Sequence, residues 1–536
     1  MICRLLLLTS LVLLPASLLS AEPLKLQLRS QHETSPGSGR FHRTIEEQNW
    51  KPEETALILC DVWDSHTCWN AVKRLEQFVP RLNETVNKAR AEGVTIIHAP
   101  SGCMDAYADH PSRQRAASQP KADNLPEEIT KWCYQIPAEE AGQYPIDQTD
   151  GGNDDTPEEK KTWLARLEAE QRNPKRPWQK QHPGIRIVAK HDFISDKGDE
   201  VWSILEDRGI KNVIVAGVHT NMCVLGRPFG LRQMVRNGKN AVLLRDMTDT
   251  MYNPASAPYV CHFAGTDLII SHIEKFVCPT ITSNQFIGGK PFRFKGDKRP
   301  NLLMVIAEGE YKTEETLPPF AEKHLSDDFR VSFAFAADDD RNLIPGIEQL
   351  QDADIALFSV RRRVLPKADM QIVRDYVASG KPIVGIRTAS HAFYIKQPPP
   401  EGYADWERWD QEVFGGNYHN HYKNDLKSTV RVDEDVKSPI LKGIDRSKRF
   451  PQGWSLYKVM PLEPGTTPLM YAEIEGHPEE PVAWTFKRAD GGRSFYTSLG
   501  NVDDFKHPTF IKLLKNGIHW AAGMKIEAGE KSTKVD

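Results

Sequence analysis

The second half of this 536-residue chain contains no cysteine. All eight cysteines lie at or before Cys278, so no disulfide can form within the second half. Without Cys3, which lies in an N-terminal signal-like segment, seven remain, and an odd number leaves at least one thiol unpaired in an oxidising compartment. Pairing of Cys68 with Cys103 or Cys133 stays open, because connectivity cannot be read from sequence.

An excess of charge of either sign is also missing. The 69 lysines and arginines nearly balance 73 aspartates and glutamates, for a net charge of −4. This composition lacks the basic footprint of a nucleic-acid-binding protein. With 39% hydrophobic residues and this length, the chain is expected to be a globular protein of two or three domains.

The apolar run at the N-terminus is too short for a comfortable membrane span. Residues 5–14 are almost all leucine or valine, follow Arg4 and precede small residues up to Ala21. This pattern predicts a signal peptide over 1–21 and an exported, periplasmic or secreted mature chain. Leu19 fits the small-residue preference of a cleavage site poorly, so an uncleaved anchor is the alternative.

Strand and helix patterns alternate through most of the chain, which predicts an α/β fold with two three-layer αβα (Rossmann-like) domains and parallel sheets. The expected order is a polar surface leader at 22–50, a first domain at 51–288, a linker at 289–300, a second domain at 301–525 and a disordered tail at 526–536. The first domain's expected strands are 55–60, 94–98, 185–189, 213–217 and 241–244. Its expected helices are 71–92, 199–208, 225–237 and 266–276.

The second domain repeats this architecture without an obvious sequence repeat. Its expected strands are 301–307, 329–335, 354–358, 382–386, 482–486 and 493–499. Its expected helices are 313–325, 367–379 and 509–522. Two long segments interrupt the alternation, 103–184 in the first domain and 397–480 in the second. The first is rich in proline and acid, and is either a lid or interface arm or a solvated excursion.

Three chemically useful side chains follow predicted parallel strands of the first domain: Asp61, Lys190 and Cys223. Ligands bind at this edge of an open parallel sheet. A thiol at a helix N-terminus has a lowered pKa and faces N–H groups that can hold an oxyanion. A carboxylate can accept the thiol proton, and a lysine can hold that carboxylate. Taken singly, each residue has another interpretation: Asp61 as a strand-end cap, Lys190 as a surface cation and Cys223 as an inert core thiol.

The segments LILCDVWDSHTC, VAKHDF and AGVHTNMCV resemble the three signatures of the isochorismatase-like cysteine hydrolases, over residues 52–285. The resemblance implies that the three residues above form a catalytic triad. It also implies a cis peptide between Val218 and His219, and an oxyanion hole made by the N–H groups of His219 and Cys223. Because the cysteine is present, the implied reaction is thiol-dependent cleavage of an amide-like C–N bond.

The first domain departs from its relatives beside Asp61. Trp63 and Asp64 stand where the family commonly has a glutamine-asparagine pair, and the expected substrate pocket is Trp63, Asp64, His66 and His98. Thiol chemistry of this kind requires no cofactor. Asp64, His66 and His98 are the candidates for a divalent metal, and polar pocket lining is the alternative.

The segments GKPIVGIRTASHAF, FGGNYHNH and FYTSLGNVDDFKHPTFIKLLKNGIHWA resemble the trehalose-utilisation (ThuA-like) branch of the class I glutamine-amidotransferase-like fold, over residues 299–525. Arg387 stands where true amidotransferases have their cysteine, so that thiol chemistry is absent. Histidines that ThuA-like proteins often have at Arg387 and Asn501 are missing too. The expected second-domain pocket contains the following residues: Arg387, His391, His419, His421 and Asp504. Alternatively, His419 and His421 are surface loop residues.

Together these features predict an exported cysteine hydrolase of amidase type with a ThuA-like accessory domain. The alternative is a non-catalytic or carbohydrate-related binding protein whose ligand site lies in the ThuA-like domain. The expected partners are a small-molecule substrate and further copies of the chain. Nucleic acid is not expected, nor is membrane beyond the signal peptide.

Overall fold

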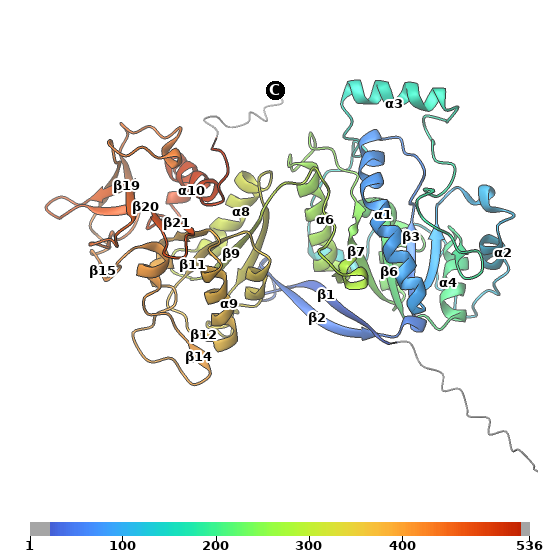
Figure 1. Cartoon of the computed structure of the whole chain (residues 1–536), viewed down its shortest axis with the longest axis horizontal. Helices are drawn as coiled ribbons and strands as arrows, with labels where there is room; N and C mark the ends of the chain where they lie inside the picture. The colour runs from blue at the N-terminus through green and yellow to red at the C-terminus, as the bar shows by residue number, and fades with distance from the viewer. Residues whose placement is uncertain (1–21, 527–536) are drawn as a thin grey trace, which may run out of the picture.

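The computed structural model describes residues 22–526. The predicted signal peptide and residues 527–536 of the predicted tail lie outside the described residues. Two α/β halves lie side by side, the first coloured blue to green and the second yellow to red in Figure 1. No helix within residues 22–526 combines the length and the apolar character needed to cross a membrane.

The first half is built on an eight-stranded sheet of order β2-β1-β8-β7-β6-β3-β4-β5. The six strands from β8 to β5 are parallel, whereas β1 and β2 are antiparallel additions at one edge. The strand bounds are β1 Leu24–Glu33, β2 Phe41–Trp50, β3 Thr55–Cys60, β4 Thr95–Ala99, β5 Phe193–Ile194, β6 Asn212–Val218, β7 Asn240–Asp249 and β8 Thr280–Ile281.

Helices cover both faces of this sheet, as a three-layer domain requires. Leu75, Phe78 and Leu82 of α1 (Trp69–Glu92) pack on one face, against side chains such as Leu57 and Ile214. The opposite face is covered by α4 (Gly198–Asp207), α5 (Leu231–Arg236) and α6 (His262–Phe276). A short α7 (Asn284–Ile287) follows β8. The parallel core and its covering helices therefore agree with the sequence prediction.

Two expectations for the first half are wrong. Residues 185–189 form no strand, and the edge strand is β5, a few residues later. The polar leader does not simply lie on the surface, because 22–50 contains the hairpin β1–β2. Its alternating Leu24, Leu26 and Leu28 are buried against the sheet. The alternation of apolar and polar residues over 24–28 is the period-2 signal of such a strand.

The β1–β2 hairpin also reaches the second half, and it lies between the two halves in Figure 1. The Nη1 atom of Arg43 donates to Oε1 of Gln349 over 3.1 Å. Arg40 pairs with Asp338 over 3.7 Å. The hairpin therefore joins the two domains in addition to the linker predicted at 289–300.

The second half has a nine-stranded sheet of order β10-β9-β11-β13-β21-β20-β19-β16-β17. The first five strands are parallel and the remainder antiparallel. The strand bounds are β9 Asn301–Ala307, β10 Arg330–Phe335, β11 Ile355–Val360, β13 Ile383–Ile386, β16 Ser428–Val432, β17 Phe450–Gln452, β19 Thr466–Glu473, β20 Glu480–Lys487 and β21 Arg493–Thr497. Two small two-stranded sheets lie apart from this one. The first pairs β12 (Leu365–Pro366) with β14 (Tyr403–Ala404), and the second pairs β15 (Asn420–His421) with β18 (Tyr457–Lys458).

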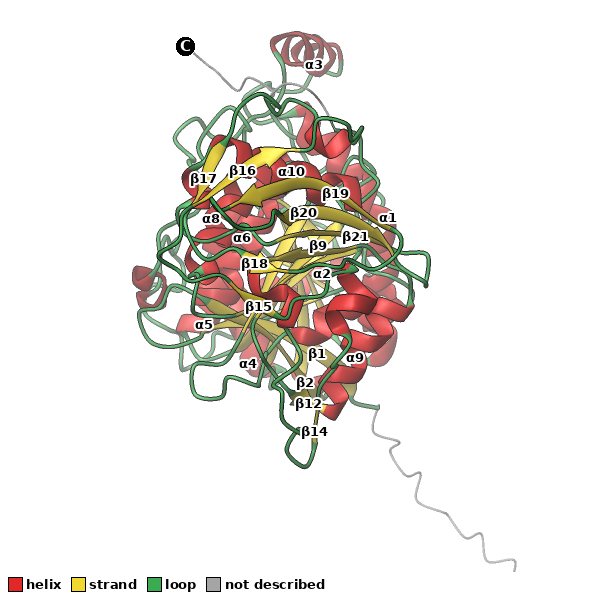
Figure 2. Ribbon diagram, turned by 90° about the vertical axis from the view of Figure 1, so that its left-hand side faces the viewer, coloured by secondary structure: helices red, strands yellow, loops and turns green. Residues whose placement is uncertain are grey.

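Helices α8 (Thr313–Leu325) and α10 (Pro508–Ala521) cover one face of this sheet, and α9 (Lys367–Ala378) covers the other. The predicted parallel core is present as the first five strands of the sheet. The interrupting segment 397–480 supplies β16, β17 and β19, which extend the sheet beyond β20 in Figure 2.

The interrupting segment 103–184 of the first half is an ordered layer rather than a solvated excursion. It contains α2 (Pro111–Ala117) and α3 (Pro157–Ala169), and α3 projects from the body in Figures 1 and 2. Glu139 anchors it through a buried ion pair with Arg232 of α5. The cysteines at 68, 103 and 133 are free thiols, so neither of the possible disulfides is present.

Candidate active site

Asp61 occupies the first position after β3, at the carboxyl edge of the parallel sheet. Its backbone has φ of +50°, a left-handed conformation that non-glycine residues seldom adopt and that is often found at functional sites. The carboxylate is fully buried: Oδ1 accepts the N–H of Ser101 at 2.8 Å, and Oδ2 accepts Nε–H of Arg227 at 2.9 Å. Burial raises the pKa of Asp61, while Arg227, Cys223 and Ser101 act in the opposite direction.

Cys223 follows β6, the neighbour of β3, in a π-helical turn over Thr220–Val224. The strand can end beside β3 because Gly217, at φ of +114°, has no Cβ; an added Cβ would lie 2.0 Å from the carbonyl oxygen of Cys60. The Val218–His219 peptide is cis, as the family resemblance implied. The structure therefore brings Asp61 and Cys223 together at the edge of adjacent parallel strands.

The thiol of Cys223 donates a hydrogen bond to Asp61, and its sulfur accepts the backbone N–H of His219. Burial, and then the charge of Asp61, raise the pKa of Cys223 well above its ordinary value. The expectation that a helix N-terminus lowers this pKa is therefore wrong. Cys223 lies in a π turn, and α5 begins only at Leu231. The thiol of Cys223 is therefore neutral in the resting site.

Lys190 is not brought to this pair. Because 185–189 form no strand, Lys190 lies exposed on a turn before β5. Arg227 takes its place as the cation paired with Asp61. The signal for Arg227 was present in the sequence, since it follows Cys223 by four residues. Its N–H donates to the carbonyl of Cys223 at 3.0 Å, so both side chains lie on one face of a single turn.

The predicted pocket residues Trp63 and His66 do lie beside Asp61. With Asp61, Ser65 and His219 they line a small cavity. Trp63 stacks on Trp178 of the insertion with ring centres 4.5 Å apart, and His66 lies edge-on to His219 at 4.7 Å. Burial lowers the pKa of His66 to about 4, so this ring is neutral. An aromatic wall, part of it supplied by the insertion, therefore borders the site.

The other two predicted pocket residues belong to structural networks. Asp64 pairs with Arg172 of the insertion at 3.1 Å. His98 is fully buried between Gln181 and Asp192, at 2.8 and 3.1 Å. Asp64, His66 and His98 therefore do not converge as a metal site.

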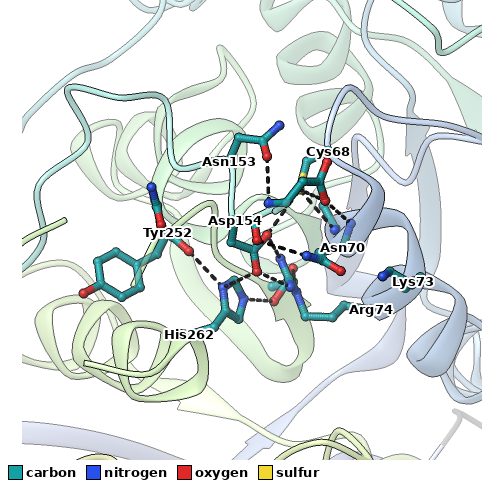
Figure 3. A network of polar contacts seen from close by, with 12 residues as sticks. Cys68, Asn70, Lys73, Arg74, Asn153, Asp154, Tyr252 and His262 are labelled. Carbon is teal, nitrogen blue, oxygen red and sulfur yellow. Dashed lines mark hydrogen bonds and ion pairs between the residues drawn. The ribbon is translucent and has the colours of Figure 1, made fainter. Parts of the chain in front are cut away.

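Among the described residues, a different group has ligand atoms close enough for a metal ion: Cys68, Asp154 and Asp155. Its two carboxylates already have partners within the protein. Figure 3 shows Asp154 of the insertion paired with Arg74 of α1, at 2.7 Å, and close to His262. Asp155 accepts backbone N–H groups at the start of α1. This network fastens the insertion to the helix N-terminus.

In the second domain, Arg387 follows β13 and also has φ of +50°. Its side chain is fully buried between the rings of Tyr311 and Tyr457, each 4.3 Å from the guanidinium carbon. Its two Nη groups donate to the carbonyls of Ser498 and Ser455. Arg387 thus fills the strand-end position with a side chain that binds the protein itself.

The other predicted second-domain residues divide into two groups. His391 is buried and stacks on Tyr418 at 4.3 Å, and burial lowers its pKa. Asp504 is buried and accepts the N–H groups of Gly500 and Asn501. The positive charge of Arg387 acts to lower the pKa of both side chains. In contrast, the residues at 419 and 421 are exposed, the first in a loop and the second in the short strand β15.

Comparisons with known proteins agree with this division of the chain. Residues 55–257 match the family model of the isochorismatase domain, and residues 301–521 match that of trehalose utilisation, ThuA. A curated relative, ureidoacrylate amidohydrolase RutB of Agrobacterium fabrum, is 24% identical over 250 residues, which cover 44% of this chain and 90% of the relative.

Solved structures with similar folds include a ThuA-like protein from Bacteroides uniformis, 17% identical with a TM-score of 0.32, covering 44% of this chain and 95% of that chain. Another is a cysteine hydrolase from Pseudomonas syringae pv. phaseolicola, 15% identical with a TM-score of 0.26, covering 44% of this chain and 92% of that chain. On the two family matches, the chain joins an isochorismatase-like hydrolase domain to a ThuA-like domain.

Proposed function

We propose that the first domain hydrolyses an amide-like C–N bond of a small molecule, with Cys223 as nucleophile and Asp61 as its base. The contact between the Cys223 thiol and the buried, Arg227-paired carboxylate carries this proposal. A nucleophile beside an oriented base is the arrangement that covalent catalysis requires. The amidohydrolase activity named for the curated relative supports the choice of a C–N bond.

The proposed reaction begins with transfer of the thiol proton to Asp61. The thiolate then attacks the carbonyl carbon, and the new S–C bond places negative charge on the carbonyl oxygen. The backbone N–H groups of His219 and Cys223 are the proposed donors to that oxyanion. When the C–N bond breaks, the leaving nitrogen takes the proton from Asp61, and a thioester remains.

Water completes the cycle. It gives a proton to Asp61 as its oxygen attacks the thioester, the S–C bond breaks, and the thiolate recovers the proton. Arg227 holds the carboxylate of Asp61 in place during both half-reactions. Each step uses residues of the chain itself, so the proposal includes no cofactor.

A screen of amides, N-carbamoyl compounds and N-acyl compounds tests the proposal. The Cys223→Ala protein serves as the blank, since it lacks only the sulfur. Amine or ammonia release by the wild-type protein alone is the expected result. Equal release by the two proteins for every compound would contradict a thiol-dependent hydrolase.

We also propose that the protein is exported and that the ThuA-like domain is an accessory rather than a second reaction centre. The buried Arg387, whose two Nη groups donate to carbonyls of the protein itself, supports the accessory role. Expression of the full chain beside a chain that begins at Glu22 tests export. Recovery of both proteins in the cytoplasm alone would count against it.

A further inference from the structure

Arg227 has more hydrogen-bond donors than its contact with Asp61 uses. A guanidinium group carries five N–H donors. The Nε–H of Arg227 donates to Asp61 at 2.9 Å, and within residues 22–526 the Nη1 and Nη2 groups have no hydrogen-bond partner. Its side chain is 26% exposed, whereas Asp61 is fully buried. The unused donors therefore lie on the solvent side of the catalytic pair.

The insertion fixes the orientation of this guanidinium. Trp132 stacks on Arg227, with the guanidinium carbon 5.1 Å from the ring centre. Gly226 permits this approach, because a Cβ there would lie 2.3 Å from Nε1 of Trp132. The N–H of Cys133 donates to the carbonyl of Gly226 at 2.8 Å, which holds the two segments together. With Asp61 and Trp132 both in contact with it, the guanidinium plane is set before any ligand arrives.

We propose that the two Nη groups of Arg227 bind a carboxylate of the substrate, so that the hydrolysed compound is a small amide or N-carbamoyl compound bearing a carboxylate. The proposal rests on the hydrolase function proposed above. The planar guanidinium can donate two parallel hydrogen bonds to the two oxygens of one carboxylate, a bidentate fork. Because the guanidinium of Arg227 pairs with Asp61, which contacts the Cys223 sulfur, a carboxylate bound to Arg227 leaves the rest of a short substrate beside that sulfur. Arg227 would thus serve both the base and the specificity of the site.

Two alkylating reagents that differ in charge test this inference without any hydrolysis. In each, a cysteine thiolate displaces iodide, and iodoacetate carries a carboxylate where iodoacetamide carries an amide. The measured quantity is the rate of iodoacetate labelling of Cys223 divided by the rate of iodoacetamide labelling, by mass spectrometry of the peptide. The same ratio in the denatured chain is the reference. We expect the folded protein to exceed that reference at least tenfold.

Variants assign the preference to the fork. Arg227→Gln should lower the ratio to the denatured value, and Arg227→Lys should recover only part of it, because lysine keeps the charge without the fork. Arg176→Gln is the matched control, since Arg176 is an exposed insertion arginine near Gly102, and it should leave the ratio unchanged. A folded-state ratio no higher than the reference would overturn the inference. Labelling of Cys223 that occurs only when the protein unfolds would overturn it as well. Retention of the preference in folded Arg227→Gln would do the same.

A competition experiment with the wild-type protein avoids any dependence on how the variants fold. Propanoate should slow iodoacetate labelling of Cys223, and propanamide should not. Equal effects of the two compounds would overturn the inference. The outcome is separate from the proposed function: hydrolysis without carboxylate preference removes only the inference, and carboxylate preference without hydrolysis removes only the proposed function.

Discussion

Asp61 of the first domain and Arg387 of the second occupy equivalent places with opposite consequences. Each directly follows a central parallel strand, and each has φ of +50°. The carboxylate of Asp61 contacts a thiol and a partly exposed arginine. The guanidinium of Arg387 instead turns inward, to two carbonyls and two tyrosine rings. A strand-end position therefore identifies a reaction centre only when its side chain contacts groups that can react.

Removing the proton acceptor of the first domain should give the largest effect. Asp61→Asn keeps the shape of the side chain but cannot take the thiol proton. We expect kcat for the amide found in the substrate screen to fall by on the order of 10²-fold or more. Asp64→Asn is the matched control, because Asp64 lies nearby but pairs with Arg172. Unchanged turnover in Asp61→Asn would refute the proposed base.

The same kind of change in the second domain should affect stability and not turnover. Arg387→Met leaves the carbonyls of Ser498 and Ser455 without their donor, in a fully buried place. The expected loss is on the order of 3 kcal/mol of unfolding free energy, measured by urea denaturation.

The exposed Arg408, which pairs with Glu412 one helical turn away, provides the control. Arg408→Met should change the unfolding free energy by less than about 0.5 kcal/mol. Hydrolysis should persist in both variants under folding conditions. A loss of turnover in folded Arg387→Met would show that the ThuA-like domain contributes to the reaction.

The pH dependence of the first domain should report the cation beside Asp61. Burial raises the pKa of Asp61, and Arg227 opposes that rise. Because Asp61 must be ionised to accept the thiol proton, kcat/KM should fall as the pH falls through this pKa, at a higher pH than for an ordinary aspartate. Arg227→Gln should move this acid limb upward by about one pH unit or more. An acid limb that stays in place would show that Arg227 does not support the base.

The fold was predictable where the pattern was strong. Apolar runs located the central strands, a helical pattern located α1, and the motif around Asp61 and Cys223 identified two residues that meet in space. The antiparallel strands β16, β17 and β19 escaped prediction, because their segment is long and mixes loops with short strands. The thiol pKa also escaped prediction, because it is set mainly by burial and then by the charge of Asp61, and neither can be read from the local sequence.

Lys190 gives the last and smallest predicted effect. The family resemblance assigns Lys190 to the triad. If Lys190 paired with Asp61, Lys190→Met should lower kcat/KM about as much as loss of the base. The structure instead places Lys190 exposed on a turn, with Arg227 as the partner of Asp61. We therefore expect Lys190→Met to change kcat/KM by less than about twofold, since surface substitutions away from a site seldom matter. Arg227→Met, measured in parallel, should lower kcat/KM strongly. The reverse order of effects would restore Lys190 to the triad and require it to approach Asp61 during turnover.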